Sequence, residues 1–313
     1  MIPPVAHFIW LGPRLPWIFR LAIRSAALRG GFERVLLHHD HPLELGDLES
    51  AHVFEARPLR VDEVLGHRSV EFARLREIYA QLESFASRVN LLRLAILLRE
   101  GGVYLDTDTV TVRSFDALRR EAGIFCGEER VTLPYRVVRT RDPHVLLQAG
   151  LLMAVRDVAR RLPEGWRAFR KIEARYHLAA NNAVLGASKE HAFIQGLVAH
   201  IVQLPAEERT KRYRLGTHAL QEYVRTYSGD DLVVHPPETF YPLGPEISEH
   251  WFRRCKRPKL DEVLSPTTHL VHWYASVRTR RIVPRVDANY VRDHRDNQLF
   301  SALVSSLLMD GDM

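Results

Sequence analysis

The feature that most constrains this chain is a long helical pattern that ends at two glycines and passes directly into a strand. Residues 69–100 carry apolar side chains such as Phe72 and Leu75 at spacings of three and four, which predicts one face of a helix or of two consecutive helices. Gly101 and Gly102 end that pattern, and the apolar segment VYLDTDTVTV follows as a strand. A helix that leads into a strand in this way is typical of α/β proteins.

The same alternation of helix and strand patterns continues on both sides of this segment. Strands are expected at residues 5–12, 32–40, 52–60, 123–129 and 269–277, and the segment 231–243 is expected to begin as a strand and run into a Pro-rich loop. A short strand or turn is expected at 181–187, and helices are expected at 15–29, 142–176, 189–204 and 217–226. We therefore expect an α/β fold with a mostly parallel central sheet flanked by helices. No Ser/Gly-rich linker divides the chain, so residues 1–313 are predicted to form one domain with a helical insertion at 131–178.

Charge and composition exclude some classes of protein. The net charge is +6, but the basic residues are scattered along the chain, whereas nucleic-acid binders concentrate them on one face. The excess charge fits anionic phosphates or an acidic surface better. The apolar stretches are shorter than the roughly 20 residues of a membrane span, and the N-terminus lacks a secretory signal pattern. We expect a cytoplasmic protein with two reduced cysteines; peripheral membrane association and secretion as an effector are the alternatives.

Two carboxylates stand one residue apart at the end of the strand in residues 103–112. If the strand continues through them, Asp106 and Asp108 point to the same side of the sheet, at the strand end where open α/β sheets bind ligands. Two neighbouring anions need a cation, and Mg²⁺ or Mn²⁺ prefers carboxylate and phosphate oxygens. The alternatives are a loop with two solvated aspartates and a phosphatase of the haloacid-dehalogenase type, in which the first Asp of DTDTV is a nucleophile.

Three separated segments extend the motif around Asp106 and Asp108. They are HFIWLG at 7–12, SRVNLLRLAILLREGGVYLDTDT at 87–109 and HWYAS at 272–276. In this order they resemble the DXD-containing sugar-binding glycosyltransferases. That family includes fungal initiating α-1,6-mannosyltransferases, bacterial capsular polysaccharide transferases and, more distantly, the large clostridial glucosylating toxins. The weaker matches ANNAVLGASKEHAFI and TFYPL extend the resemblance over most of the chain outside 131–178.

The resemblance implies a GT-A fold, a bacterial nucleotide-sugar transferase and a divalent cation, commonly Mn²⁺. It implies transfer of a hexose from a nucleoside-diphosphate sugar with retention at the anomeric carbon. The acceptor, which is a glycan, a small molecule or a protein, is not implied, and neither is the nucleotide. A non-catalytic nucleotide-sugar-binding protein and a toxin-like transferase that modifies a host protein remain alternatives.

The resemblance also implies roles for particular residues. In the first half of the chain, Trp10 stacks on the donor base, Arg93 contacts the donor phosphate or sugar, Tyr104 supports the donor, Asp106 binds ribose and sugar hydroxyls, and Asp108 binds the metal. Arg93, Asp106 and Asp108 form the catalytic set.

Residues in the second half complete the implied site. Asn182 lies near the donor sugar, with Asn181 as the weaker candidate. His272, Trp273 and Ser276 close the nucleotide site, and His272 or Ser276 completes the metal shell.

Two positions depart from the family pattern. Asn90 stands three residues before Arg93, where the family carries an Asp that contacts sugar hydroxyls. Asn90 can still hydrogen-bond these hydroxyls, but it carries no charge, so donor choice or turnover can differ. Val277 stands where the family ends its last motif with Trp, which weakens the prediction for the nucleotide end.

Overall fold

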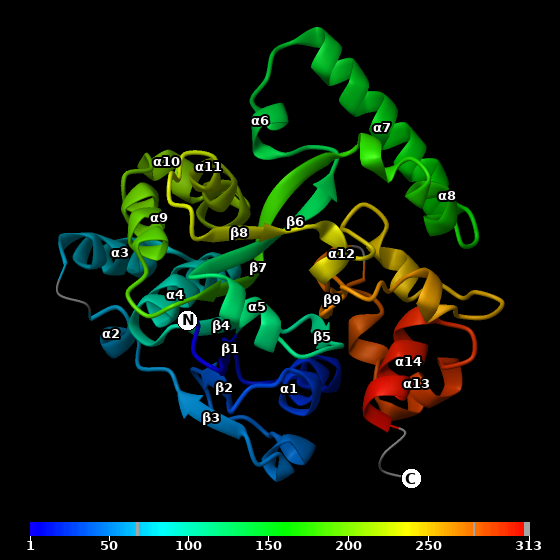
Figure 1. Ribbon diagram of the computed structural model, residues 1–313, viewed down its shortest axis with the longest axis horizontal. Coiled ribbons are helices and arrows are strands. Elements are labelled where there is room, and N and C mark those ends of the chain that lie inside the picture. Colours follow the sequence, from blue (N-terminus) through cyan, green and yellow to red (C-terminus); the bar gives the residue numbers. More distant parts are fainter. Residues whose placement is uncertain (67–68, 278, 310–313) are drawn as a thin grey trace.

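The computed structural model describes residues 1–66, 69–277 and 279–309, and its centre is one large mixed sheet (Figure 1). The strands of this sheet are β1 (Val5–Trp10), β2 (Arg34–His39), β3 (Phe54–Pro58), β4 (Gly102–Leu105), β6 (Ile124–Val131), β7 (His177–Ala187) and β8 (Leu232–His235), in the order β3-β2-β1-β4-β7-β6-β8. Strand β7 runs antiparallel to both its neighbours, and the other neighbouring strands are parallel. The expected α/β class with a mostly parallel sheet is confirmed.

Helices cover both faces of the sheet. The helices of the described residues are α1 (Trp17–Arg29), α2 (Val61–Val64), α3 (Val70–Gln81), α4 (Phe85–Glu100), α5 (Asp116–Glu121), α6 (Tyr135–Val138), α7 (Pro143–Arg161), α8 (Trp166–Arg170), α9 (Ala192–Val202), α10 (Ala206–Arg209), α11 (Ala219–Val224), α12 (Pro237–Phe240), α13 (Ala288–His294) and α14 (Leu299–Val304). Buried side chains of α3, α4, α9 and α11 form one core on one face of the sheet, and those of α1 and α5 form a second core on the other face. None of the helices in the described part of the chain has the length and apolarity needed to cross a bilayer.

The glycine pair after α4 holds β4 against the centre of the sheet. Ser84 caps the start of α4 by accepting a hydrogen bond from the Ser87 backbone N–H at 3.4 Å, and Gly101 ends the helix with a φ of +68°. Gly102 has a φ of +103°, and a Cβ there would lie 2.6 Å from the Val5 carbonyl oxygen of β1. Only glycine fits this position without a shift of the backbone.

The single strand expected over residues 103–112 is wrong. Strand β4 ends at Leu105, the chain turns at residues 106–108, and β5 (Thr109–Thr111) pairs with β9 (Leu270–His272) in a separate two-stranded sheet. The Thr109 hydroxyl donates to the Asp106 carbonyl at 2.7 Å and so closes the turn. The two aspartates therefore lie in a turn between two sheets, and the alternation of a strand does not determine where they point.

The segment between β6 and β7 is a long excursion between two neighbouring strands. It carries α6, α7 and α8, and Pro163 lies between α7 and α8, so the helix expected over 142–176 is divided there. These helices lie beyond one end of the sheet (Figure 1). Strand β7 is longer than the expected strand or turn because it pairs with β6 at both its ends, on either side of an irregularity at residues 182–184. The assignment of 131–178 as an insertion in a single domain stays a prediction.

Candidate functional site

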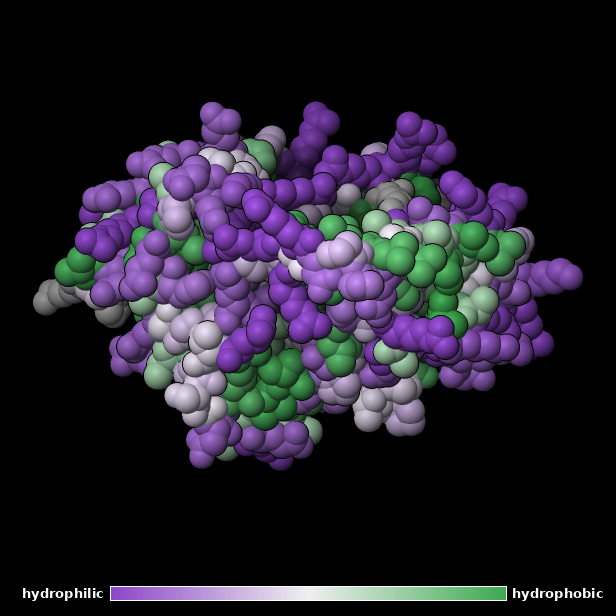
Figure 2. Space-filling view, turned by 90° about the horizontal axis from the view of Figure 1, so that it is seen from above, coloured by the Kyte–Doolittle hydropathy of each residue, from purple (hydrophilic) through white to green (hydrophobic). Residues whose placement is uncertain are grey.

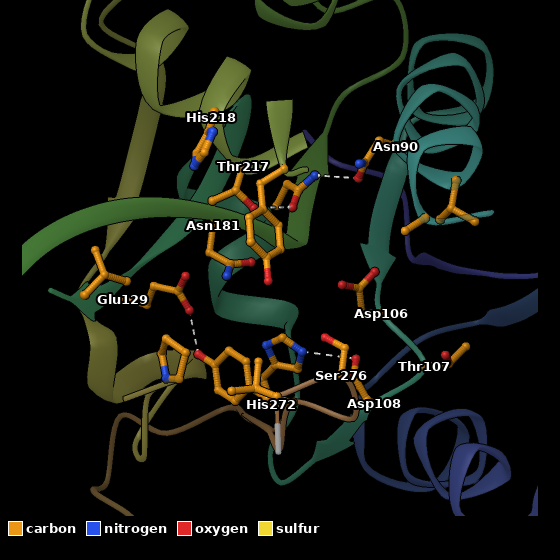
Figure 3. Close-up of a pocket in the computed structure, with 18 of the residues that line it drawn as sticks. Asn90, Asp106, Thr107, Asp108, Glu129, Asn181, Thr217, His218, His272 and Ser276 are labelled. Atoms are coloured by element: carbon orange, nitrogen blue, oxygen red, sulfur yellow. Dashed lines mark hydrogen bonds and ion pairs between the residues drawn. The ribbon is translucent and has the colours of Figure 1, made fainter. Parts of the chain in front are cut away.

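A cavity of about 610 Å³ opens at the carboxyl ends of β1 and β4 (Figure 3). Its wall includes residues from the end of β1, from α4, from the turn at 106–108, from β6 and β7, and from the chain that follows β9. Strands β1 and β4 are parallel neighbours, so their carboxyl ends reach the same edge of the sheet. This edge is where open α/β sheets bind ligands.

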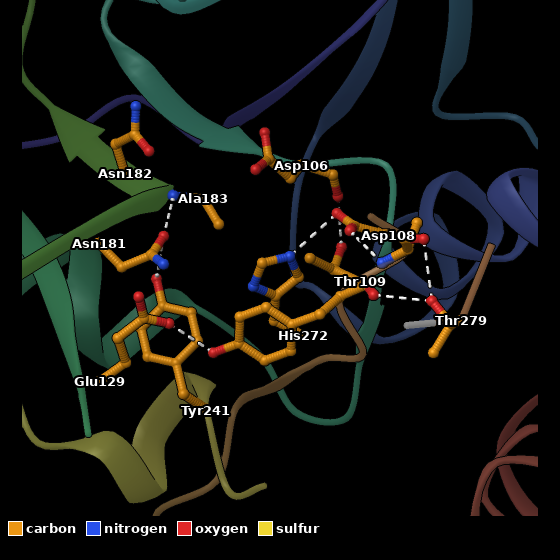
Figure 4. Close-up of polar contacts among 12 residues, drawn as sticks. Asp106, Asp108, Thr109, Glu129, Asn181, Asn182, Ala183, Tyr241, His272 and Thr279 are labelled. Carbon is orange, nitrogen blue, oxygen red and sulfur yellow. Dashed lines mark hydrogen bonds and ion pairs between the residues drawn. The ribbon is translucent and has the colours of Figure 1, made fainter. Parts of the chain in front are cut away.

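Asp106, Asp108 and His272 form an acidic cluster in this cavity. One potential ligand atom from each residue lies within 4.8 Å of the others. Asp108 accepts at 3.0 Å from the His272 Nε2, and its second carboxylate oxygen accepts the Ala275 N–H at 2.8 Å (Figure 4). His272 comes from the distant β9, whose pairing with β5 places it opposite Thr109.

The pKa values of the two aspartates are shifted in opposite directions. Burial raises the pKa of Asp106, and Asp108 adds to this effect, although Arg93 opposes it. Burial also acts to raise the pKa of Asp108, but His272 and the Ala275 N–H outweigh it and bring that pKa below its usual value. Burial acts to lower the pKa of His272, and Asp108 outweighs this and raises it. The cluster therefore has one carboxyl group that ionises readily and one that resists ionisation without a further cation.

Arg93 of α4 connects the acidic turn to β7. Its Nη2 donates to the Asp106 Oδ1 at 3.0 Å, its Nη1 donates to the Asn182 carbonyl, and its guanidinium lies 4.2 Å from the centre of the Tyr104 ring. The Tyr104 hydroxyl donates to the same Asp106 oxygen at 2.8 Å. The Arg93 side chain is only 5% exposed, so it supplies a fixed positive charge next to the acidic cluster.

Asn90 and Asn182 face each other across the cavity wall. The Asn182 amide donates to the Asn90 Oδ1 at 2.9 Å, and the Thr217 hydroxyl donates to the Asn182 Oδ1 at 3.2 Å. A carboxylate at position 90 would accept the same hydrogen bond from Asn182. The departure from the family pattern at this position therefore changes the charge of the site more than its geometry.

Two tryptophans expected at the donor site have different environments. Trp10 is half-buried at the cavity wall, where its indole N–H donates to the Arg14 carbonyl at 2.9 Å. Trp273 is fully buried and packs against Phe252 and Phe300, so the structure does not bring it to the cavity. Its neighbours His272 and Tyr274 line the cavity instead.

The sequence-based reasoning missed several residues of the cavity wall. Glu129 is buried, accepts the Tyr274 hydroxyl at 2.6 Å and has a pKa raised by burial. The sequence signal that could have identified Glu129 as a site residue is the presence of a glutamate inside the apolar strand pattern of 123–129. Other missed wall residues include Arg156 of α7, Thr217 and His218 of the π-helical segment Arg214–His218, and Gln221 of α11. Their positions depend on packing between distant segments.

The donor set of the acidic cluster fits a hard divalent cation. Two carboxylates and one imidazole can reach a common point, and Ser276 lines the same cavity. Mg²⁺ and Mn²⁺ accept such oxygen-rich sets and complete their coordination with water or substrate phosphates. The structure thus contains a candidate cation site at the edge of a ligand-sized cavity.

Residues 32–124 match a family described as "Glycosyltransferase sugar-binding region containing DXD motif". This match confirms the resemblance drawn from the sequence, and the matched segment includes Asn90, Arg93, Asp106 and Asp108. A comparison with curated protein sequences found no match.

The solved structures that match this chain include three glycosyltransferase structures. The structure named PaToxG Glycosyltransferase has 15% sequence identity and a TM-score of 0.44, with 72% of this chain and 69% of that chain covered. The ligand-free glycosyltransferase domain from the YGT toxin has 11% identity and a TM-score of 0.43, covering 75% and 80%. The UDP-bound form of that domain has 10% identity and a TM-score of 0.36, covering 91% and 78%.

Proposed function

We propose that this protein is a metal-dependent, retaining glycosyltransferase that moves a hexose from a nucleoside-diphosphate sugar to an acceptor. The observation that carries the proposal is the cluster of Asp106, Asp108 and His272 beside the fixed charge of Arg93, in a cavity of about 610 Å³. Cavities of about 300–1,000 Å³ are the usual size for small-molecule and cofactor sites.

Each side of the cluster has a separate role in this proposal. Asp108 and His272, with Ser276 nearby, hold the cation, which is Mn²⁺ or Mg²⁺. When bound, the cation neutralises the charge that develops on the departing nucleoside diphosphate. Arg93 adds a positive charge that is already in place before the reaction. Asp106 accepts hydrogen bonds from donor hydroxyls through the carboxylate oxygen that Arg93 and Tyr104 leave free.

The donor occupies the cavity from the β1 end to β7 in the same proposal. Trp10 offers an aromatic surface for the base at the end of β1, and Asn182 lies near the sugar on β7. Retention at the anomeric carbon and transfer of a hexose rest on the resemblance to the DXD family. The acceptor is a glycan, a small molecule or a protein.

The contacts of Asp106 do not separate the phosphatase alternative from the glycosyltransferase. One Asp106 oxygen accepts from both Arg93 and Tyr104, and the oxygen that they leave free is open either to a nucleophilic role or to a hydrogen bond from a donor hydroxyl. The match of residues 32–124 to the DXD family supports the glycosyltransferase.

A metal-dependence assay tests the proposed function. Asp108→Asn keeps the shape of the side chain but removes the charge that binds the cation, so hydrolysis of the preferred UDP-, GDP- or TDP-sugar in Mn²⁺ should fall about 100-fold or more. Asp296→Asn is the matched control, because the Asp296 side chain is 92% exposed, and it should retain wild-type turnover. Full turnover by Asp108→Asn in the presence of a chelator would contradict the proposal.

Calorimetry separates an enzyme from a binding protein. An enzyme should bind its nucleotide sugar with Mn²⁺ and then release free sugar or transfer it. A protein that binds the donor with the same affinity and never turns it over would be a non-catalytic relative, for which the uncharged Asn90 is the structural argument.

A further inference from the structure

Helix α7 exposes a continuous apolar face. Leu147, Leu151, Val155, Val158 and Leu162 are 65%, 61%, 44%, 56% and 47% exposed, and their spacing of three and four residues places them on one side of the helix. We call these five residues the α7 stripe. Figure 2 shows apolar side chains gathered on the face that looks upward in Figure 1, on the side of the molecule that carries α7.

Two arginines of α7 face the body of the protein instead. Arg156 pairs with Glu246 at 2.8 Å and Arg160 pairs with Glu249, and both arginine side chains are less than 15% exposed. A surface helix ordinarily buries its apolar face and presents charged residues to water. Contiguous exposed apolar surface in a soluble protein marks an interaction site, and the folding of this chain does not cover the α7 stripe.

Positive charge surrounds the α7 stripe. Residues 135–175 contain ten Lys or Arg against four Asp or Glu, a net charge of +6 that equals the net charge of the whole chain. The exposed basic residues of this segment are Arg136, Arg139, Arg141, Arg161, Lys171 and Arg175. Of the acidic residues, Asp157 and Glu164 form ion pairs with arginines of the same segment. The surface therefore combines an apolar helix face with basic side chains at both ends of the helix.

We propose that α7 docks on an anionic lipid bilayer. The helix lies in the plane of the membrane surface, the α7 stripe enters the boundary between headgroups and acyl chains, and the exposed basic residues contact anionic headgroups. The stripe extends over about 22 Å at 1.5 Å per residue. This length suits a helix that lies on the membrane.

A second copy of the chain fits the surface less well. Two segments with a net charge of +6 repel each other when they approach. A stable dimer interface also buries about 1,200–2,000 Å² in total, which one helix face of this length does not supply. An anionic membrane satisfies both the apolar stripe and the surrounding charge.

Docking at α7 would hold the cavity next to the membrane. Arg156 of α7 and Leu133, which precedes α6, both line the cavity. Helix α7 therefore carries the α7 stripe on its outward side and a residue of the cavity wall on its inward side. This inference does not depend on the chemistry proposed for the acidic cluster.

Vesicle flotation of the full chain tests the proposal. Wild-type protein should float with vesicles of phosphatidylcholine and 30% phosphatidylserine at least tenfold more than with phosphatidylcholine alone, and high salt should release it. The triple variant Leu147→Gln/Leu151→Gln/Val158→Gln should bind at least tenfold less. The matched control is Leu28→Gln/Val70→Gln, which removes apolar side chains of 58% and 66% exposure elsewhere and should bind as wild type does.

Further measurements make a negative result informative. Arg161→Gln/Lys171→Gln should weaken binding to anionic vesicles and leave the folding transition unchanged by circular dichroism. Wild-type protein that ignores anionic vesicles, or a stripe variant that still binds them, would overturn the proposal. Sedimentation velocity could instead show a wild-type dimer that the stripe variant abolishes, while neither protein binds vesicles. That result would assign the α7 stripe to an interface with a second copy and would also overturn the membrane proposal.

Discussion

At the scale of single residues, the candidate site depends on the ion pair between Arg93 and Asp106. Arg93 is nearly buried, and its three contacts reach the acidic turn, β7 and the Tyr104 ring. Removal of one member of a buried ion pair leaves the other charge without compensation, which costs more than the net value of the pair. Arg93 therefore has a structural function in addition to its proposed contact with the donor.

The variant Arg93→Gln should lower the free energy of unfolding by about 3 kcal/mol, because Asp106 loses its cation in a buried environment. Urea denaturation monitored by circular dichroism measures this change. Arg60→Gln is the matched control: the Arg60 side chain is 75% exposed and pairs with Glu63 on the surface, so the change should stay within about 0.5 kcal/mol. Equal stability of the two variants would show that Arg93 does not support the acidic turn.

At the scale of the elements, strands β1 and β2 share a buried pair of histidines. His7 donates through Nε2 to the Gly101 carbonyl at 2.9 Å, and its Nδ1 accepts from the His38 Nε2 at 3.1 Å. This arrangement requires a neutral His7 ring, because its Nδ1 must be unprotonated to accept. Burial lowers the pKa of His7 to about 4 and the pKa of His38 to about 2.

The histidine pair should make the stability of the protein fall in mild acid. In the unfolded chain both rings bind protons near pH 6.5, whereas in the folded chain they remain neutral to lower pH. The stabilisation is therefore complete above pH 6.5 and declines as the pH falls toward 4. We expect a loss of about 2–4 kcal/mol between pH 7 and pH 5, measured by urea denaturation at each pH.

A variant isolates the contribution of this pair from that of other buried histidines such as His250, whose pKa burial also lowers to about 4. His38→Gln should show a shallower decline with pH than the wild type. His52→Gln, at an exposed position, should follow the wild-type curve. A His38→Gln curve parallel to that of the wild type would rule out a role for the pair.

At the scale of the whole molecule, the candidate site joins segments that are distant in the chain. The acidic turn follows β4, Asn182 lies in β7, and His272 ends β9. A ligand that contacts all three should stabilise the folded state by mass action, by about 2.7 kcal/mol at a concentration of 100 times its Kd. For a protein of this size, that corresponds to a rise of several degrees in Tm.

A thermal-shift screen of UDP-, GDP- and TDP-sugars with and without Mn²⁺ measures this stabilisation. One nucleotide sugar should raise the Tm only with the cation, and the rise should be absent in Asp108→Asn. If no donor changes the Tm in Mn²⁺ while vesicle flotation still succeeds, the proposed function fails and the proposed membrane surface stands.

Local patterns in the sequence determined a large part of the fold. The apolar spacing of residues 69–100 predicted α3 and α4, and the glycines at 101 and 102 marked the start of β4. Alternating helix and strand patterns predicted the α/β class. These features depend on the periodicity of side chains and on the freedom of the glycine backbone, which act within a few residues. The DXD segment was recognisable from its resemblance to a known family, which also depends on a local run of residues.

Only the tertiary structure decided which side chains meet. The chain turns between β4 and β5 because Thr109 closes the turn and β5 pairs with a strand about 160 residues further along. That pairing brings His272 to Asp108 and directs Trp273 into the core. The outward apolar face of α7 likewise follows from the ion pairs of Arg156 and Arg160 with distant glutamates. Contacts between remote segments depend on the packing of the whole chain, and no local pattern encodes them.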